Sequence, residues 1–282
     1  MKHFLLGLTA VLSSFGAVSQ NTMLYKISGN GLKQPSYLFG TIHITCEATL
    51  EKPVLDALDN TSQLYLELDM DDPSMQATMM SGMMMKGGKT MSSMVSEEDF
   101  KVLDDFVKEK VGVSAIMLNT MKPFMVSTMF LPYLLDCPMQ SIESELVKVS
   151  KEQNEEIFGL EAVEEQLAVF DAIPYEVQMQ ELIKSVKSGF ASDREEIRRV
   201  MELYKNKDLN SLLSSIADSD NKITAEHQDE LLFTRNENWV PRIEKVMKEK
   251  PTFFGVGAAH LPGDKGVIEL LKKKGYKVEP VQ

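Results

Sequence analysis

Two histidines occur in the same local sequence, and they are the first candidates for chemistry. His43 closes the run GTIH (40–43) and His260 closes GAAH (257–260), each after an apolar stretch. Imidazole nitrogens are common ligands of divalent metals, and a glycine allows close approach of the backbone because it has no Cβ. A single Gly-x-x-His sequence is a weak signal. Its repetition in a chain with 4 histidines leaves two interpretations open: metal or catalytic residues, or hydrogen-bonded core imidazoles.

Carboxylates follow or lie on two further apolar runs. Glu67 lies in the alternating run LYLELD (64–69), where it shares a strand face with Asp69, and Glu161 directly follows EIFGL (156–160). The ends of parallel strands meet at one edge of an α/β sheet, so side chains distant in sequence converge there. We therefore expect His43, His260 and Glu67 to meet at one site.

This donor set defines the expected metal centre. Two imidazoles and a carboxylate suit Mn, Fe, Co or Zn, so His43, His260 and Glu67 are the predicted ligands. Asp69 is an alternative ligand or a partner of one, and Glu161 is a further catalytic carboxylate. His227 lies in a polar helical stretch and is interpreted as a surface residue.

Arg235 is the third candidate for catalysis. It falls on the apolar stripe of a helix expected over about residues 225–248, close to Leu231 and Trp239. A buried guanidinium needs a carboxylate or a bound anion. The sequence leaves both roles open: a salt bridge that fixes the helical part to the sheet, or binding of a substrate anion or a developing oxyanion.

The first 19 residues have the features of a secretory signal peptide. A short basic start precedes an apolar stretch, and small residues at 17–19 provide a cleavage site. The stretch is short for a bilayer span, and a retained anchor is the alternative. We expect export to the periplasm or the outside, without a stable membrane anchor after cleavage. In that setting Cys46 and Cys137 are expected to form a disulfide, with two buried thiols as the alternative.

The remaining chain, residues 20–282, is expected to form a single α/β domain. Apolar or alternating runs predict strands over 36–42, 64–69, 156–160, 252–256 and 276–281. Helical patterns cover 96–109, 114–129, 141–153, most of 163–248, and 265–274 with Asp264 as its N-cap. The expected fold is a mixed sheet built from N- and C-terminal strands with a large helical insertion.

Residues 70–94 contain nine methionines. A soft-metal site is one interpretation, but the segment has no His or Cys to complete it. A flexible lid or groove wall is favoured, since methionine adapts to irregular surfaces.

Charge and missing motifs exclude several classes of protein. The net charge of −12 argues against a nucleic-acid partner and against electrostatic attachment to anionic lipid. The helical His-Glu-x-x-His of common zinc peptidases does not occur, nor does the Gly-x-Ser-x-Gly of serine hydrolases.

The ordered motifs resemble the TraB/GumN family across residues 24–281. They are YLFGTIH (37–43), LELD (66–69), GLE (159–161) with Gln166, RNENW (235–239) and VGAAHLPG (256–263). One departure is Ala259, where the family usually has a glycine before the histidine. The family is related to Tiki-type metalloproteases, erythromycin-esterase-like proteins and haem-binding ChaN-like proteins.

The resemblance implies site residues and a cofactor. In the Tiki branch two Gly-x-x-His motifs and a glutamate use a divalent metal, with Mn or Co implied. By that similarity His43 and His260 are ligands, Glu67 is the essential acid and Glu161 another candidate.

These features together predict an exported metal-dependent hydrolase, peptidase-like, that acts on a peptide or small-molecule substrate. The alternative is a non-catalytic binding protein that sequesters a small peptide or a haem-like ligand. The predicted cofactor is a divalent metal, Mn, Co or Zn.

Overall fold

Within the part of the chain that the structure describes, strands from near both ends form one mixed sheet of six strands. The computed structural model describes residues 21–282, so the predicted signal peptide lies outside the described residues. The strand order is β4-β3-β5-β2-β1-β6. The strands are β1 (Leu24–Ser28), β2 (Ser36–Thr41), β3 (Leu64–Leu66), β4 (Ile157–Gly159), β5 (Phe253–Gly257) and β6 (Lys277–Pro280). β2, β5, β3 and β4 are parallel, whereas β1 is antiparallel to β2 and β6. The carboxyl ends of the four parallel strands therefore lie at one edge.

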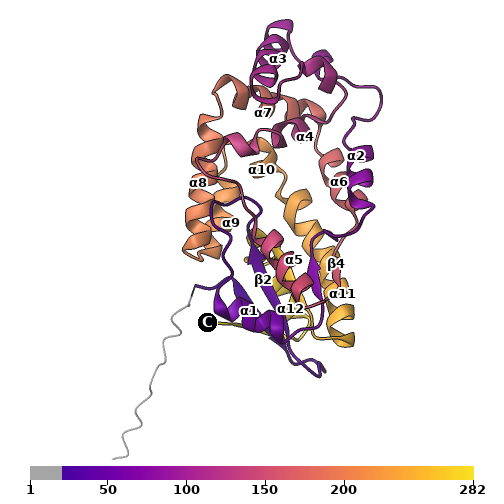
Figure 1. Cartoon of the computed structure of the whole chain (residues 1–282), viewed down its shortest axis with the longest axis vertical. Helices are drawn as coiled ribbons and strands as arrows, with labels where there is room; N and C mark the ends of the chain where they lie inside the picture. Colours follow the sequence, from indigo (N-terminus) through magenta and orange to yellow (C-terminus); the bar gives the residue numbers. More distant parts are fainter. Residues whose placement is uncertain (1–20) are drawn as a thin grey trace, which may run out of the picture.

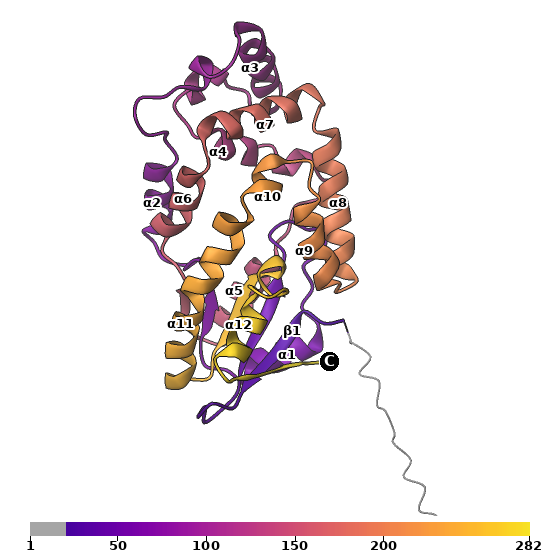
Figure 2. The same cartoon turned by 180° about the vertical axis from the view of Figure 1, so that it is seen from behind.

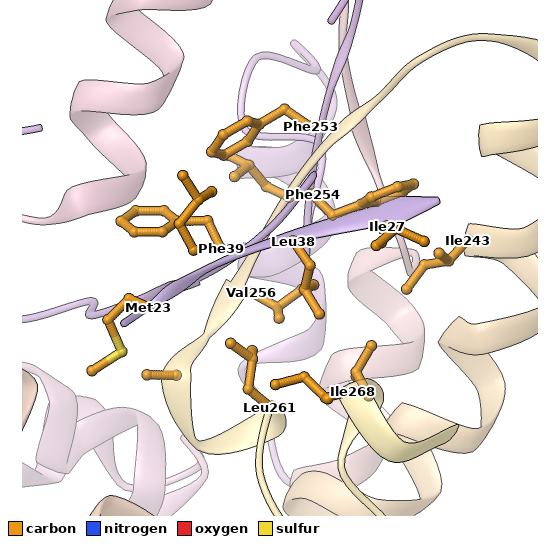
Figure 3. Packing of buried hydrophobic residues seen from close by; sticks show 14 of the residues in the cluster. Met23, Ile27, Leu38, Phe39, Ile243, Phe253, Phe254, Val256, Leu261 and Ile268 are labelled. Carbon is orange, nitrogen blue, oxygen red and sulfur yellow. The ribbon is translucent and has the colours of Figure 1, made fainter. Parts of the chain in front are cut away.

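Helices cover both faces of this sheet. On one face lie α1 (Lys52–Asp59) and α5 (Ile142–Glu152) (Figure 1), and on the other lie α11 (Thr234–Glu249) and α12 (Val267–Lys273) (Figure 2). With both faces covered, the central parallel strands are apolar on both sides. Phe253, Phe254 and Val256 of β5 are fully buried, and Figure 3 shows them with Leu38 of β2 and Ile243 of α11.

The remaining helices form a second layer beyond the carboxyl edge of the parallel strands. They are α2 (Met75–Gly82), α3 (Glu97–Val111), α4 (Pro123–Thr128), α6 (Val163–Ala172), α7 (Tyr175–Lys187), α8 (Ala191–Lys205), α9 (Leu209–Ala217) and α10 (Lys222–Glu226). In Figure 1, α3, α4 and α7 lie at the end of the long axis away from the sheet. They enclose a separate apolar core that includes Leu103, Phe130 and Met179.

Local sequence explains the boundaries of α3. Ser96 caps its first turn by accepting a hydrogen bond from the Asp99 backbone N–H at 3.1 Å, and three acidic residues occupy that turn. Gly112 ends the helix with φ of 82°, a conformation that glycine adopts without steric cost.

The predicted fold class is confirmed: a single α/β domain with strands from both termini and a large helical middle. The sequence pattern did not predict β1. This strand lies between β2 and β6 and pairs antiparallel with both. Strand 64–69 is shorter than expected, because the chain bends after Leu66. The helix expected over 225–248 is interrupted: a π-helix at Asp229–Phe233 precedes α11.

The helix near the C-terminus also starts later than expected. Gly266, rather than Asp264, is the N-cap of α12, because the chain first makes a turn in which the Gly266 N–H bonds to the Gly263 carbonyl. Gly275 follows the helix with φ of 90°, a left-handed conformation that favours glycine.

The predicted disulfide between Cys46 and Cys137 is present, with the two Cα atoms 5.7 Å apart. A backbone pairing of Thr45 with Gln140 lies beside it. These links attach the loop after β2 to the segment that enters α5. Across residues 21–282 no helix combines the length and apolarity needed to cross a membrane.

The methionine-rich segment 70–94 is divided between surface and core. Its helix α2 has no buried residue, and Met80 is largely exposed. Met85 and Met91, in contrast, belong to the second apolar core. The segment therefore contributes in part to ordinary packing, and none of its residues lines the cavity beside the candidate site described below.

Candidate active site

His43 lies two residues beyond β2, at the carboxyl edge of the sheet. Its side chain is 62% exposed, and its Nδ1 is 2.7 Å from Oε1 of Glu143, a buried carboxylate in the first turn of α5. Desolvation lowers the pKa of His43, but the Glu143 carboxylate, aided by Glu67, more than offsets this and raises the pKa to about 9. Glu143 thus orients the ring and favours its protonated form.

His260 lies in the short 3-10 helix Ala258–His260 that follows β5, and it is buried. Its Nδ1 is 2.7 Å from Oδ1 of Asn236, and its ring packs against Trp239 at 4.5 Å between centroids. An amide oxygen only accepts, so Nδ1 carries the proton and Nε2 keeps its lone pair. Burial, with the nearby Arg235 charge, lowers the pKa of His260 to about 3, so this imidazole is neutral.

Glu67 lies between the two imidazoles. Its Oε1 is 3.8 Å from Nε2 of His43 and 3.8 Å from Nε2 of His260. The same oxygen accepts the backbone N–H of Gly257 at 2.8 Å. Burial alone would raise the pKa of Glu67, but Arg235, both histidines and the Gly257 N–H hold it far below its usual range. Glu67 is therefore an ionised carboxylate at any ordinary pH.

Arg235 from α11 binds both predicted catalytic carboxylates. Its Nη2 donates to Oε2 of Glu67 at 2.5 Å and to Oε1 of Glu161 at 2.6 Å. Its Nη1 donates to the Leu231 carbonyl at 3.0 Å and lies 3.3 Å from Nε2 of His260. The side chain is 11% exposed. These contacts give the salt bridge to the sheet that the sequence left open as one role of Arg235.

Both carboxylate oxygens of Glu161 accept hydrogen bonds within this network. Its two oxygens accept from Arg235, and Oε2 also accepts the indole N–H of Trp239 at 2.9 Å. Gln166 of α6 reaches the other carboxylate, with Nε2 3.5 Å from Oε2 of Glu67. Glu161 consequently positions Arg235, and Arg235 in turn positions Glu67.

The donor atoms suit a divalent metal in type and orientation. Each histidine has an oxygen 2.7 Å from its Nδ1 and its Nε2 3.8 Å from Oε1 of Glu67, an arrangement similar to that of metal-bound histidines. Bonds of about 2.0–2.2 Å allow two ligands to lie up to about 4.2 Å apart. The separations of 3.8 Å are within that limit.

Gly257, which has no Cβ, leaves open space beside the donor atoms. A Cβ on Gly257 would lie 3.2 Å from Oε1 of Glu67 and 3.7 Å from Nε2 of His43. No group of three or more His, Cys, Asp or Glu side chains within 21–282 has the spacing of a preformed centre. The residues fit a metal through the types and orientation of their donor atoms, although they do not form a preformed centre.

A cavity of about 630 Å³ adjoins His43. It lies between the end of β2 and the helices α4, α7, α8 and α10, with apolar residues such as Phe124, Leu131 and Ile197 in its wall. Three candidate ligands, His43, His260 and Glu67, belong to the described residues. Of these three, only His43 lines the cavity. A ligand in the cavity would therefore meet the site at the exposed imidazole.

The structure brings together His43, His260, Glu67, Glu161 and Arg235, and their roles as ligands and catalytic groups stay predictions. Asp69 is not among the contacts of this cluster, because its Oδ1 accepts the backbone N–H of Asp71 at 3.4 Å after the chain bends. His227, interpreted from the sequence as a surface residue, has a side chain that is only 18% exposed and lies 3.6 Å from Glu230, before α11.

Sequence reasoning missed Glu143. The signal was present, because Glu143 is in helical register with the buried Leu146 and Ser150 of α5. A carboxylate on the buried stripe of a helix calls for a partner, by the same argument that singled out Arg235.

Comparison with known proteins agrees with the resemblance drawn from the motifs. Metalloprotease TIKI2 of Danio rerio is 23% identical over 316 residues, which cover 92% of this chain and 61% of that protein. Metalloprotease TIKI1 of Homo sapiens is 23% identical over 300 residues, covering 87% of this chain and 59% of that protein. The chain thus spans about three fifths of the length of these relatives. No solved structure matches it significantly. Residues 23–280 match the TraB/PrgY/gumN family, and the chain belongs to that family.

Proposed function

We propose that this protein is a metal-dependent hydrolase that acts on a peptide or a related substrate. The observation that carries the proposal is the convergence of Nε2 of His43 and Nε2 of His260 on one oxygen of Glu67, at 3.8 Å each. The distant similarity to proteins named metalloproteases supports the same reaction class.

In this proposal His43, His260 and Glu67 hold the ion, which is Mn, Co or Zn. When bound, such an ion lowers the pKa of a coordinated water to about 7 and polarises a carbonyl oxygen. Glu67 suits the role of ligand better than that of general base, because a base works best with a pKa near the working pH. Its pKa lies far below that range, since Arg235 and the two histidines outweigh the effect of burial.

Arg235 contributes by fixing Glu67. Its contacts with Glu67, Glu161 and the Leu231 carbonyl engage Nε, Nη1 and Nη2. Its positive charge also balances two buried carboxylates, which would otherwise be costly to keep ionised. We assign Arg235 and Glu161 to positioning, and an oxyanion contact from Arg235 would require one of these hydrogen bonds to open.

Export is part of the proposal. The signal-peptide features of residues 1–19 and the disulfide between Cys46 and Cys137 both favour an oxidising compartment, the periplasm or the outside. In such a compartment the disulfide secures the loop that carries His43.

Capture of a small ligand without turnover is the second candidate. The largely apolar wall of the cavity beside His43 favours it, because apolar concave sites of this size bind small molecules and short peptides. In that case His43, His260 and Glu67 stabilise the fold and bind no metal.

Metal analysis and turnover separate the two functions. The mature protein, the double variant His43→Ala/His260→Ala and the control His227→Ala are purified and analysed for bound metal, then mixed with a peptide library. We expect stoichiometric metal and cleavage for the wild type and for His227→Ala, and loss of both in the double variant. Binding of peptides without products from metal-loaded protein would refute the hydrolase and favour capture.

A further inference from the structure

We infer that the cavity beside His43 binds a peptide segment that presents a cationic group next to an apolar side chain. This inference rests on the proposed function, since it names the substrate class of the same site. It is carried by the charges and the burial of the residues that line the cavity on α7 and α8.

The cavity wall contains three carboxylates and no lysine or arginine to balance them, and its one cationic group, the His43 ring, is paired with Glu143 instead. Glu181 belongs to α7, and Asp193 and Glu196 belong to α8. Among the lining residues, all of which belong to the described part of the chain, none is lysine or arginine. The remaining wall is mainly apolar, as the site of an aliphatic or aromatic side chain requires.

Asp193 is the most informative of the three carboxylates. Its Oδ1 accepts the hydroxyl of Ser185 at 2.9 Å, which joins α8 to α7. Its Oδ2 is buried and has no hydrogen-bond partner in residues 21–282. A buried carboxylate oxygen without a partner is costly, and a ligand N–H would satisfy it.

The two neighbouring acids extend this negative region. Glu196 accepts the hydroxyl of Ser219 at 2.6 Å, and no lysine or arginine of the described chain pairs with it or with Asp193. Glu181 is 7% exposed and contacts the largely exposed Lys184 at 3.2 Å. Two carboxylates in the wall thus lack a counter-charge, and an ammonium or a guanidinium group complements them.

The size of the cavity limits the occupant. A volume of about 630 Å³ accommodates a small ligand or a few residues of an extended peptide, not a folded domain. Because His43 lines the same cavity, a peptide held at Asp193 and Glu196 lies beside the candidate metal ligands. Haem is disfavoured in this cavity, since its anionic propionates would face the same carboxylates.

The test measures binding without metal, so that it does not depend on turnover. Four hexapeptides share one apolar sequence and differ in two features: lysine or norleucine at the third position, and a free or acetylated N-terminus. Dissociation constants are measured in EDTA with the mature protein, with Asp193→Asn, with Glu196→Gln and with the control Glu195→Gln. Glu195 is an exposed acid on the same helix, so its replacement changes the net charge by the same amount.

We expect the wild type and Glu195→Gln to bind at least one singly cationic peptide about tenfold more tightly than the neutral peptide. Asp193→Asn and Glu196→Gln reduce this preference to about twofold or less. Comparison of the lysine peptide with the peptide that has a free N-terminus identifies which cationic group the cavity binds, the lysine ammonium or the N-terminal ammonium. Thermal unfolding tests whether each variant is folded. If Asp193→Asn is unfolded, the inference is judged on the peptide preference of Glu196→Gln.

Equal affinity for neutral and cationic peptides, or an equal loss in Glu195→Gln, would overturn the inference. A parallel cleavage assay with metal-loaded protein separates it from the proposed function. Charge-selective binding without cleavage leaves the inference standing and refutes the hydrolase, whereas cleavage without charge preference refutes the inference alone.

Discussion

Oδ1 of Asn236 lies 2.7 Å from Nδ1 of His260, inside the protein, and this contact fixes which nitrogen of His260 faces Glu67. The amide group of the same asparagine donates to the carbonyls of His260 and Lys265. One fully buried side chain on α11 therefore determines the tautomer of the histidine and the course of the loop that carries it.

Replacement of Asn236 by alanine tests this relationship. Asn236→Ala leaves the Nδ1–H of His260 and two carbonyls without their partner, so we expect a loss of about 1–3 kcal/mol in the free energy of unfolding. Metal affinity should fall about 10- to 100-fold, because the ring is no longer oriented. Urea unfolding and metal titration measure both effects. The exposed Asn238→Ala on the same helix is the control, and equal behaviour of the two variants would contradict the assignment.

The contact between Glu143 and His43 predicts a pH dependence in the metal-free protein. The folded pKa of His43 is about 9, above its usual value near 6.5. The stability from this contact is fully present below pH 6.5 and is lost as the pH rises through about 9. Glu143→Gln should lower the pKa of His43, because the ring loses the hydrogen bond and the negative charge of Glu143 that raise it.

NMR titration of the His43 ring measures that change directly. Glu145→Gln, which alters a more exposed carboxylate on the same helix, should leave the pKa near 9. A His43 pKa that is equal in Glu143→Gln and Glu145→Gln would show that Glu143 does not control the ring.

Arg235 and Arg242 lie on the same helix and form ion pairs of very different burial. Arg235→Met leaves Glu67 and Glu161 buried without their counter-charge, so we expect a destabilisation of about 3–5 kcal/mol. Arg242→Met breaks a pair with Glu165 whose side chains are 41% and 45% exposed, and should cost about 1 kcal/mol or less. Chemical unfolding of both variants checks the contrast. Similar losses would argue that the Arg235 network is no more than surface charge.

Sequence predicted the strand-end positions of the site because each depends on local pattern. His43 and Glu67 follow or lie on apolar runs that form β2 and β3, and His260 follows β5. Parallel pairing then brings these ends to one edge whatever the length of the intervening chain. The six-stranded mixed sheet was predictable for the same reason, apart from β1, whose short alternating run was passed over.

The partners of these residues were harder to predict, because they come from helices whose packing is tertiary. Glu143 and Asn236 contact the histidines only because α5 and α11 cover opposite faces of the sheet. Asp69 was misplaced because period-two alternation indicates a face only while the strand continues, and β3 ends at Leu66. The carboxylates of the cavity likewise come together only through the packing of α8 against α7, which local sequence does not indicate.

Gly257 offers the most selective test of the metal site. Its φ of −48° is negative and lies outside the left-handed region that favours glycine, so Gly257→Ala should fold. The added Cβ would lie 3.2 Å from Oε1 of Glu67, 3.5 Å from Cδ2 of His260 and 3.7 Å from Nε2 of His43, in the space where the donor atoms converge.

We therefore expect two unequal effects from Gly257→Ala. The neighbours need to shift by only a few tenths of an ångström, so the free energy of unfolding should fall by about 1 kcal/mol or less. Metal affinity should fall at least about tenfold, because the three donors can no longer close on one ion. Urea unfolding and isothermal titration with Mn²⁺, Co²⁺ and Zn²⁺ provide the two measurements. If the variant keeps wild-type affinity for all three ions, the metal does not bind between His43, Glu67 and His260.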